Sequence, residues 1–250
     1  MSFLDGPGPR VIAHRGLAIE APENTLLAFL KALTAGATHL ETDVHASADG
    51  VAVVCHDPDL TRVAGRPARV ADLRMSELRR IDLGGGQVFS SLAETLDTFP
   101  EARFNLDIKD ERAAASAVDA IRSTRAIDRV LVTSFSRRRR ESVSARLPGV
   151  ATSPSVPEFA PALLAAKAGL TPLVRRALHP FVAVQVPERQ GPLRVITART
   201  VRAVHAAGAE VHVWTVNDVA DMERLLDLGV DGIVTDRCDV LAALVASRGL

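Results

Sequence analysis

The sequence predicts an α/β protein, a (β/α)8 barrel of the TIM type. Short runs of apolar and β-branched residues alternate with longer segments of helical spacing along the whole chain, a pattern typical of parallel sheets built from βα units. The length of 250 residues is about what one such barrel requires. With one hairpin arm set aside, the β-rich runs supply the eight strands of a closed barrel.

The predicted elements begin with a strand at residues 11–14. Residues 23–36 follow, with leucines on one side of a helix that ends at Gly36. Residues 38–44 give the second strand, and the turn signal Asp49-Gly50 makes residues 51–56 the arm of a hairpin. Further strands are predicted at 103–108, 129–133, 181–186, 211–216 and 232–235, with a weaker one near residue 150. Helices are predicted at 111–124, 136–146, 158–179, 198–207, 218–228 and 238–248.

An open, doubly wound sheet is the alternative fold. It would require a first loop of the G-x-G-x-x-G type, and residues 14–19 do not supply one. No linker or break in composition divides the chain, so residues 1–250 are predicted to form a single barrel domain with a short excursion after the second strand, at about 57–91. The stretch 148–161, with four prolines, is expected to be a loop that leads into the next helix.

Composition and charge exclude several classes of protein. Lys plus Arg and Asp plus Glu both total 30, so no net charge draws the chain to nucleic acid or to an acidic membrane. No apolar run approaches the roughly 20 residues of a membrane span, which argues against stable membrane insertion. The two cysteines, Cys55 and Cys238, form no CxxC pair, so a reduced, cytoplasmic setting is expected. The sequence does not indicate an oligomeric state.

Polar side chains gather where the predicted strands end. In a barrel this edge carries the chemistry, because the βα loops meet there. Glu41 and Asp43 are two residues apart in one strand and therefore share a face, as do Asp107 and Lys109 in another. The other polar or aromatic residues at strand ends are His14, Arg15, His56, Ser134, Gln185, Trp214 and Asp236. This is more charge than a core built for stability would hold.

These residue types fit the chemistry of a phosphodiester. Three carboxylates, Glu41, Asp43 and Asp107, offer the hard oxygen ligands that Mg²⁺ or Ca²⁺ prefers. Glu41 and Asp43 as a salt-bridged pair is the alternative, but no basic residue lies between or beside them in the sequence. Two histidines serve as acid and base near neutral pH, and basic groups neutralise the anionic substrate. For Trp214, packing and a substrate contact are equally open.

Several short motifs follow one another from about residue 10 to the C-terminus. They are His14-Arg15-Gly16, Pro22-Glu23-Asn24-Thr25, Glu41-Thr42-Asp43-Val44, Asp49-Gly50, His56-Asp57, Asn105-Leu106-Asp107-Ile108-Lys109, Trp214-Thr215-Val216-Asn217 and Asp231-Gly232-Ile233-Val234-Thr235-Asp236. Each motif alone is weak, but the ordered set resembles the signature of the glycerophosphodiester phosphodiesterase family.

The resemblance implies a TIM barrel that hydrolyses glycerophosphodiesters, small-molecule substrates, to sn-glycerol 3-phosphate and an alcohol. It implies one divalent metal ion, Mg²⁺ or Ca²⁺ with Mn²⁺ as a further option, and catalysis by a histidine pair. The roles it carries over are metal binding by Glu41, Asp43 and Asp107, catalysis by His14 and His56, substrate or phosphate contacts by Arg15, Lys109 and Trp214, and support from Glu23 and Asn24. Gln185, at a strand end, is a further supporting candidate.

The chain departs from the family pattern at two places. Asp107 stands where Glu is common, which shortens the reach of that ligand by one methylene. The excursion is short and contains Gly84-Gly85-Gly86, so the expected specificity for the alcohol is open. A lysophospholipase-D-like activity on a lipid and a non-catalytic phosphate-binding barrel are the alternatives. Also open are which histidine is the acid and whether a cyclic phosphate forms.

Overall fold

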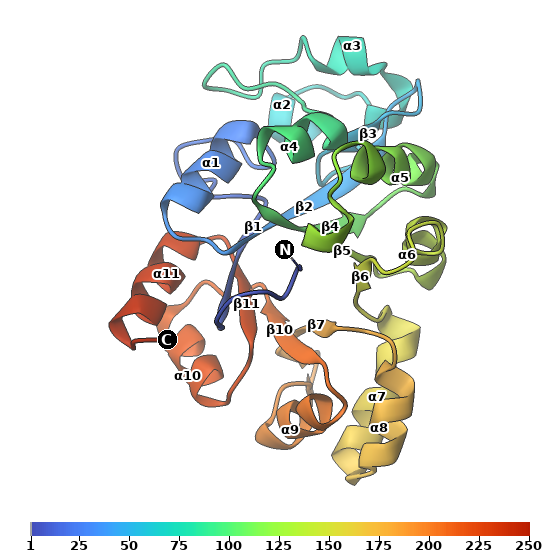
Figure 1. The fold of residues 1–250 in the computed structure, drawn as a ribbon. Coiled ribbons are helices and arrows are strands. Elements are labelled where there is room, and N and C mark those ends of the chain that lie inside the picture. Colours follow the sequence, from blue (N-terminus) through green and yellow to red (C-terminus); the bar gives the residue numbers. More distant parts are fainter. Residues whose placement is uncertain (1) are drawn as a thin grey trace.

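Eight parallel strands form the centre of the molecule, as the sequence predicts. The computed structural model describes residues 2–250. The parallel strands are hydrogen-bonded in the order β6-β5-β4-β2-β1-β11-β10-β7. The two end strands, β6 and β7, lie close to each other. The amide of Val182, next to β7, donates to the carbonyl of Thr152 in β6 at 3.1 Å. The sheet is therefore a nearly closed barrel, with its helices on the outside (Figure 1).

The strand boundaries lie close to those expected from the apolar pattern. The barrel strands are β1 (Arg10–His14), β2 (His39–Ala46), β4 (Arg103–Ile108), β5 (Val130–Thr133), β6 (Ala151–Thr152), β7 (Ala183–Pro187), β10 (Glu210–Trp214) and β11 (Gly232–Thr235). The predicted hairpin arm is β3 (Ala52–Val54), which pairs antiparallel with β2. A separate exposed hairpin, β8 (Arg189–Gln190) and β9 (Leu193–Arg194), follows β7.

Helices connect the strands. They are α1 (Leu26–Thr34), α2 (Thr61–Ala64), α3 (Met75–Leu78), α4 (Leu92–Thr98), α5 (Ala114–Ser123), α6 (Arg137–Ser144), α7 (Val156–Ala168), α8 (Thr171–Leu178), α9 (Ala198–Ala206), α10 (Val219–Asp227) and α11 (Cys238–Ser247). Short 3-10 turns are η1 (Val70–Asp72), η2 (Glu111–Ala113) and η3 (Ile127–Arg129). Within residues 2–250, every helix is too short or too polar to cross a lipid bilayer.

The main apolar core lies between the strands and the helices. Alternate residues of a strand face opposite sides of the sheet. In β2, Leu40 and Val44 join the core cluster beneath the helices, whereas Glu41 and Asp43 alternate with them and are also buried. The barrel interior is correspondingly polar, and this arrangement leaves acidic groups near the carboxyl ends of the strands.

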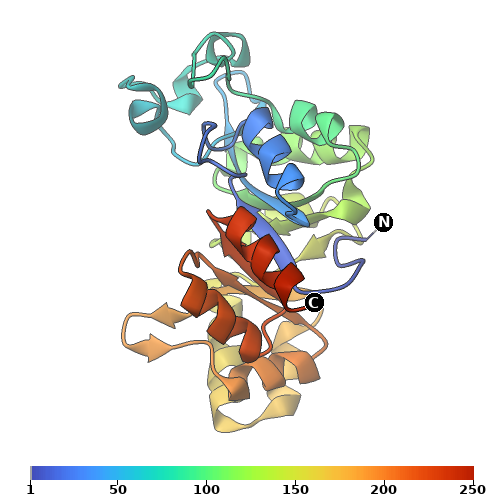
Figure 2. The same cartoon turned by 90° about the vertical axis from the view of Figure 1, so that its left-hand side faces the viewer.

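The excursion between β3 and α4 has a small core of its own. Its buried residues are Val53, Cys55, Leu60, Val70, Met75, Leu78, Ile81 and Phe89. Figure 2 shows that the excursion and the β8–β9 hairpin project on the side of the barrel away from the N-terminus. Both segments are therefore placed where the βα loops gather.

Residues near the N-terminus cover the opposite end of the barrel. Phe3 is fully buried against Leu131 and Ala183, and its ring meets His39 edge-on at 4.7 Å between centroids. The Arg10 guanidinium donates to the carbonyls of Leu4, Gly6 and Pro7, and it also pairs with Glu210 at 2.9 Å. These contacts seal the amino ends of the strands.

The prediction of one helix over residues 158–179 is wrong. Two helices occupy this region, because Gly169 ends α7 in the left-handed conformation, with φ of +77°. Helix α7 also begins at Val156, inside the segment expected to be a loop, since Ser155 caps it and a proline is tolerated in the first turn. Helix α4 was not expected, although Ser91 and Glu94 form its capping box.

Candidate active site

The strands β1, β2 and β4 bring the predicted acidic residues and His14 together. In the sheet, His14 is the register partner of Glu41, and Asp43 is the partner of Asp107. Because adjacent strands lie about 4.8 Å apart, these side chains share one end of the barrel. His56 reaches the same region from the residues after β3, and its carbonyl accepts a hydrogen bond from His45 Nε2 at 2.9 Å.

Two turns with unusual backbone angles fix the residues that follow β1. Arg15 and Asn24 both have positive φ, +57° and +56°, and the Asn24 amide donates to the Arg15 carbonyl at 2.9 Å. The Asn24 side chain accepts from the Thr42 hydroxyl at 2.7 Å and donates to Asp43 at 3.3 Å. Asn24 therefore ties the β1–α1 loop to β2. Asparagine tolerates this left-handed conformation better than most residues.

Two cationic side chains form ion pairs with the cluster of carboxylates. Lys109 Nζ lies 3.0 Å from Asp43 Oδ1 and 2.6 Å from Asp107 Oδ2, and Arg15 Nε lies 3.4 Å from Asp43 Oδ2. The absence of basic residues beside Glu41 and Asp43 in the sequence therefore does not exclude ion pairs, because folding brings Arg15 and Lys109 to Asp43 from distant positions. Glu41 accepts from the Arg15 backbone amide at 3.1 Å.

Even with Lys109 and Arg15 nearby, the negative charge of the buried acidic residues is not fully compensated. Burial and the neighbouring Asp43 raise the pKa of Glu41 to about 8. Burial also raises the pKa of Asp107, against the opposing effect of Lys109. The Oδ1 atom of Asp107 is buried without a hydrogen-bond partner among the described residues. Additional positive charge at this point would stabilise the ionised carboxylates.

A preformed metal cage is not present in the part of the chain that the structure describes. No three His, Cys, Asp or Glu side chains within residues 2–250 are arranged to hold an ion. Lys109 instead stands between Asp43 and Asp107. The donors nevertheless fit a hard divalent cation, because they are carboxylate oxygens and one of them, Asp107 Oδ1, has no partner.

The two histidines have the same arrangement of partners. His14 Nδ1 donates to Asp236 at 2.7 Å, and His56 Nδ1 donates to Asp57 at 2.7 Å. An ionised carboxylate only accepts, so each neutral ring carries its proton on Nδ1 and has the Nε2 lone pair free for proton transfer. Burial opposes protonation of His14, but the hydrogen bond to Asp236 and the charge of Glu41 raise its pKa overall.

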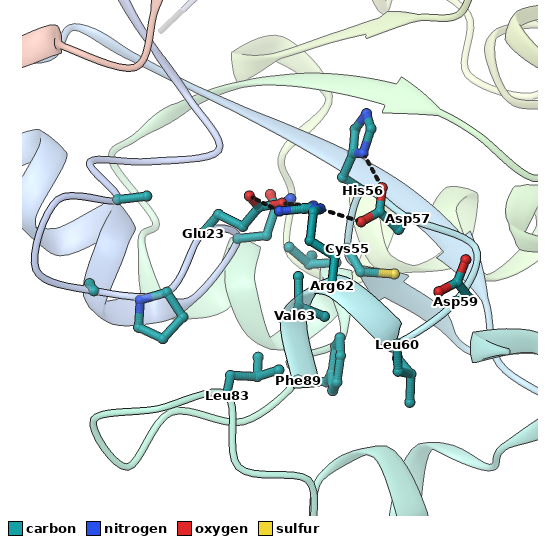
Figure 3. Close-up of a pocket in the computed structure, with 15 residues that line it drawn as sticks. Glu23, Cys55, His56, Asp57, Asp59, Leu60, Arg62, Val63, Leu83 and Phe89 are labelled. Carbon is teal, nitrogen blue, oxygen red and sulfur yellow. Dashed lines mark hydrogen bonds and ion pairs between the residues drawn. The ribbon is translucent and has the colours of Figure 1, made fainter. Parts of the chain in front are cut away.

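A chain of ion pairs extends from His56 to the β1–α1 loop. Arg62 in α2 donates to Asp57 at 2.6 Å and to both oxygens of Glu23 at 2.6 and 2.7 Å, and Arg15 also contacts Glu23 at 3.2 Å. Figure 3 shows Arg62 lying between Glu23 and Asp57, with His56 beyond Asp57. A cavity of about 290 Å³ adjoins this chain, lined by apolar residues that include Leu60, Val63, Leu83 and Phe89.

The remaining predicted residues lie at different depths. Trp214 ends β10 half-buried, and Phe135 meets it edge-on at 5.6 Å between centroids. Lys109 Nζ is 5.6 Å from the centre of the Phe135 ring, so the aromatic pair borders the cationic group. Gln185 pairs in register with His212, two residues below Trp214 in β10, and is not at the rim itself.

The sequence prediction did not assign roles to three residues of this site. Asp57 directly follows His56, and Asp236 directly follows the last strand, so both positions carried a signal that was not used. Arg62 carried no such signal, because arginines are abundant in this chain and the ion pair depends on a fold of the excursion that no spacing rule gives.

Comparisons with known proteins agree with one another. The model of the "Glycerophosphoryl diester phosphodiesterase family" matches residues 14–240. A "Probable glycerophosphodiester phosphodiesterase 2" of Mycobacterium tuberculosis is 39% identical over 100% of this chain and 95% of its own length. The crystal structure of a "Putative glycerophosphoryl diester phosphodiesterase" from Silicibacter pomeroyi superimposes with a TM-score of 0.81 at 26% identity, covering 98% of this chain and 96% of that one. An Oleispira antarctica phosphodiesterase, solved with the product sn-glycerol-3-phosphate, has a TM-score of 0.77 at 24% identity over 96% and 97%.

Proposed function

The chain belongs to the glycerophosphoryl diester phosphodiesterase family and is an enzyme of that family, a phosphoric diester hydrolase, and on this premise we propose that it hydrolyses glycerophosphodiesters to sn-glycerol 3-phosphate and an alcohol. The observation that carries the proposal is the pair of carboxylate-bound histidines, His14 and His56, beside a buried group of acids and bases. The product held by the Oleispira antarctica phosphodiesterase supports the choice of product.

Each histidine has its own task in the proposed reaction. One Nε2 atom accepts the proton of the attacking hydroxyl or water, and the other donates a proton to the alkoxide that leaves phosphorus. The histidine that accepts the proton is neutral with its own proton on Nδ1, whereas the histidine that donates is the imidazolium, protonated on both nitrogens. In either state the bond from Nδ1 to Asp57 or Asp236 orients the ring so that Nε2 makes the transfer. Arg15 and Lys109 bind the phosphate oxygens and stabilise the charge that develops in the transition state.

A divalent cation, Mg²⁺, Ca²⁺ or Mn²⁺, would be held by Glu41, Asp43 and Asp107, where it would supply Lewis-acid charge neutralisation to the phosphate. The raised pKa of Glu41, about 8, and the unpartnered oxygen of Asp107 support this assignment. Lys109, which now pairs with two of the three carboxylates, would then be released to contact the substrate.

The aromatic pair and the β1–α1 loop would shape the rest of the site. Trp214, with Phe135 beside it, forms a wall for the glycerol end of the substrate. Glu23 and Asn24 support Arg15 and Asp43. Gln185 contacts His212 below the rim and would act only by supporting the strand ends. The barrel and its excursion act as one functional unit.

The deciding measurement is sn-glycerol 3-phosphate release from a panel of glycerophosphodiesters that differ in the alcohol. The protein is first treated with a chelator, and then Mg²⁺, Ca²⁺ or Mn²⁺ is restored. Release should fall after chelation and return with at least one cation. Because the two histidines carry the proton transfers, His14→Ala and His56→Ala should each lower kcat by about 10²–10⁴-fold.

Matched controls separate loss of chemistry from loss of fold. His179 is exposed, and His179→Ala should turn over like the wild type. Wild-type rates in both His14→Ala and His56→Ala would contradict the catalytic assignment. Equal rates with and without chelator would contradict the metal assignment while leaving the reaction class intact.

A lysophospholipid is the second candidate substrate. Apolar side chains are exposed in the segments that follow the barrel strands, among them Phe135 at 52%, Val156 at the start of α7 at 60% and Leu193 at 44%. Such side chains would contact an acyl chain near the opening of the site. Release of choline from lysophosphatidylcholine, with no turnover of glycerophosphocholine, would favour this candidate over the first.

A further inference from the structure

The guanidinium of Arg62 connects the carboxylate of Asp57, in the excursion, with that of Glu23, in the β1–α1 loop. Its Nε atom donates to Asp57 Oδ2 at 2.6 Å, and its two terminal nitrogens donate to Glu23 at 2.6 and 2.7 Å. The other oxygen of Asp57 accepts from His56 Nδ1 at 2.7 Å. Arg62 is therefore two hydrogen bonds away from the imidazole of His56.

The partners of Arg62 come from both sides of the candidate site. Glu23 precedes α1 and also pairs with Arg15 at 3.2 Å, whereas Asp57 belongs to the excursion. A planar guanidinium with donors in a fixed fork can hold both carboxylates in one plane, which a single ammonium cannot do. Figure 3 shows this arrangement directly above the apolar lining of the cavity.

We propose that Arg62 is a positioning residue for the hydrolysis, which fixes the Asp57 carboxylate so that His56 keeps its proton on Nδ1 and presents Nε2 to the substrate. Through Glu23, the same side chain holds the excursion against the loop that carries Arg15. The inference rests on the proposed function for its kinetic consequence, but not for its effect on the His56 ring.

Stability alone does not account for the arrangement. The Arg62 side chain is 50% exposed, and ion pairs at that exposure add little to folding. The contacts do restrict Asp57, because one of its oxygens is bonded to Arg62 and the other to His56. Without Arg62, Asp57 would be free to rotate, and the neutral His56 ring would populate both tautomers.

The test combines kinetics with nitrogen-15 NMR of the histidine rings. Arg62→Gln should lower kcat by about 10–100-fold, the usual effect of losing a group that orients a functional ligand, with KM changed by less than about threefold. Arg62→Lys should lose less, because lysine can contact one of the two carboxylates. In the free protein, the His56 signal, identified by its loss in His56→Gln, should shift from the Nδ1–H tautomer towards a mixture in Arg62→Gln.

The control variant is Arg66→Gln, which replaces an exposed arginine four residues along in the same excursion. It should leave kcat and the His56 signal unchanged. Wild-type kcat in Arg62→Gln would overturn the proposal, and so would a lowered kcat with an unchanged His56 tautomer. If the wild type releases no sn-glycerol 3-phosphate, the proposed function fails, and the NMR comparison still decides the role of Arg62.

Discussion

Gly16 stands directly after the pair His14-Arg15 at a point where the chain leaves no room for a side chain. Its φ is +82°, and a Cβ atom built there would lie 2.7 Å from the backbone carbon of Ala28 in α1. Glycine is the residue that tolerates this conformation without strain. The close approach of the β1–α1 loop to α1 thus depends on a missing methyl group, and the loop is the segment that aims Arg15 and Asn24 at the acidic set.

Replacement of Gly16 by alanine should therefore lower the free energy of unfolding by about 2–4 kcal/mol, since both backbone strain and overpacking oppose it. Urea unfolding monitored by circular dichroism measures the change. Gly50→Ala is the matched control, because Gly50 has a similar φ of +78° but no atom within 4 Å of the added Cβ. Its cost should be only about 1 kcal/mol. Equal losses in the two variants would show that the contact with Ala28 does not matter.

The positions of the acidic residues follow from the sequence more readily than their partners do. Alternation along a strand places Glu41 and Asp43 on one face, and the register of β2 with β4 then brings in Asp107. The place of Lys109 between two carboxylates is not fixed by alternation, because a flexible side chain with four methylenes can reach several acceptors. Arg62 is further removed still, since its place depends on the path of the whole excursion.

At the scale of elements, α4 shows how a buried arginine can end a helix. Arg129, the last residue of η3 and directly before β5, is 6% exposed and donates to the carbonyls of Leu96, Phe99 and Ala102. The last carbonyls of a helix have no partner within the helix and must find donors elsewhere. Here one guanidinium supplies them and attaches α4 to the next βα unit.

Arg129→Met keeps much of the side-chain volume but removes all the donors. The variant should lose about 3 kcal/mol of unfolding free energy, because buried carbonyls are left without partners. Thermal unfolding followed by circular dichroism is the measurement. Arg202→Met, at an exposed position of α9, should change the stability by less than about 0.5 kcal/mol. If Arg129→Met also lost less than about 0.5 kcal/mol, water would replace the guanidinium without penalty.

Element identity was predictable where periodicity was long and unbroken. The strands β4 and β11 have the expected boundaries, because Phe104, Leu106 and Ile108 alternate with polar residues in β4, and β11 has the apolar pair Ile233-Val234 at its centre. Boundaries set by single residues were not predictable from periodicity. Gly169 divides α7 from α8 in a stretch whose apolar spacing alone indicates one helix, and the β8–β9 hairpin is too short and too exposed to leave an apolar pattern.

At the scale of the whole molecule, the covered end of the barrel makes stability depend on pH. His39 is fully buried beside Phe3, and burial lowers its pKa from 6.5 to about 3. The folded protein therefore keeps His39 neutral, whereas the unfolded chain binds a proton below pH 6.5. Stability is lost as the pH falls through this range.

Glu210 acts in the same direction at lower pH. Burial favours its neutral form, but hydrogen bonds from His212 and Arg10 prevail and lower its pKa from 4.5 to about 2. The stability that Glu210 contributes is present above pH 4.5 and is lost as the pH falls from there towards 2. Between pH 7 and 5 the stability therefore changes through His39 and not through Glu210, whose contribution is lost only below pH 4.5.

The unfolding free energy at pH 5 should be about 2 kcal/mol lower than at pH 7 on account of His39 alone. Urea unfolding at the two pH values measures it. His39→Gln retains an amide donor for the carbonyl of Phe3, and the difference between the two pH values should shrink by about that amount in this variant. A difference that stays the same in His39→Gln would assign the pH dependence to other groups.

The cover formed by Phe3, Arg10 and the residues between them has a consequence for molecular traffic. Because these residues cover the amino ends of the strands, the candidate site is reached from the carboxyl ends of the strands. In the proposed reaction the diester would arrive from that side, and both products would leave by the same route. Departure of the products and arrival of the next diester therefore use the same passage, so one turnover has to be cleared before another can begin.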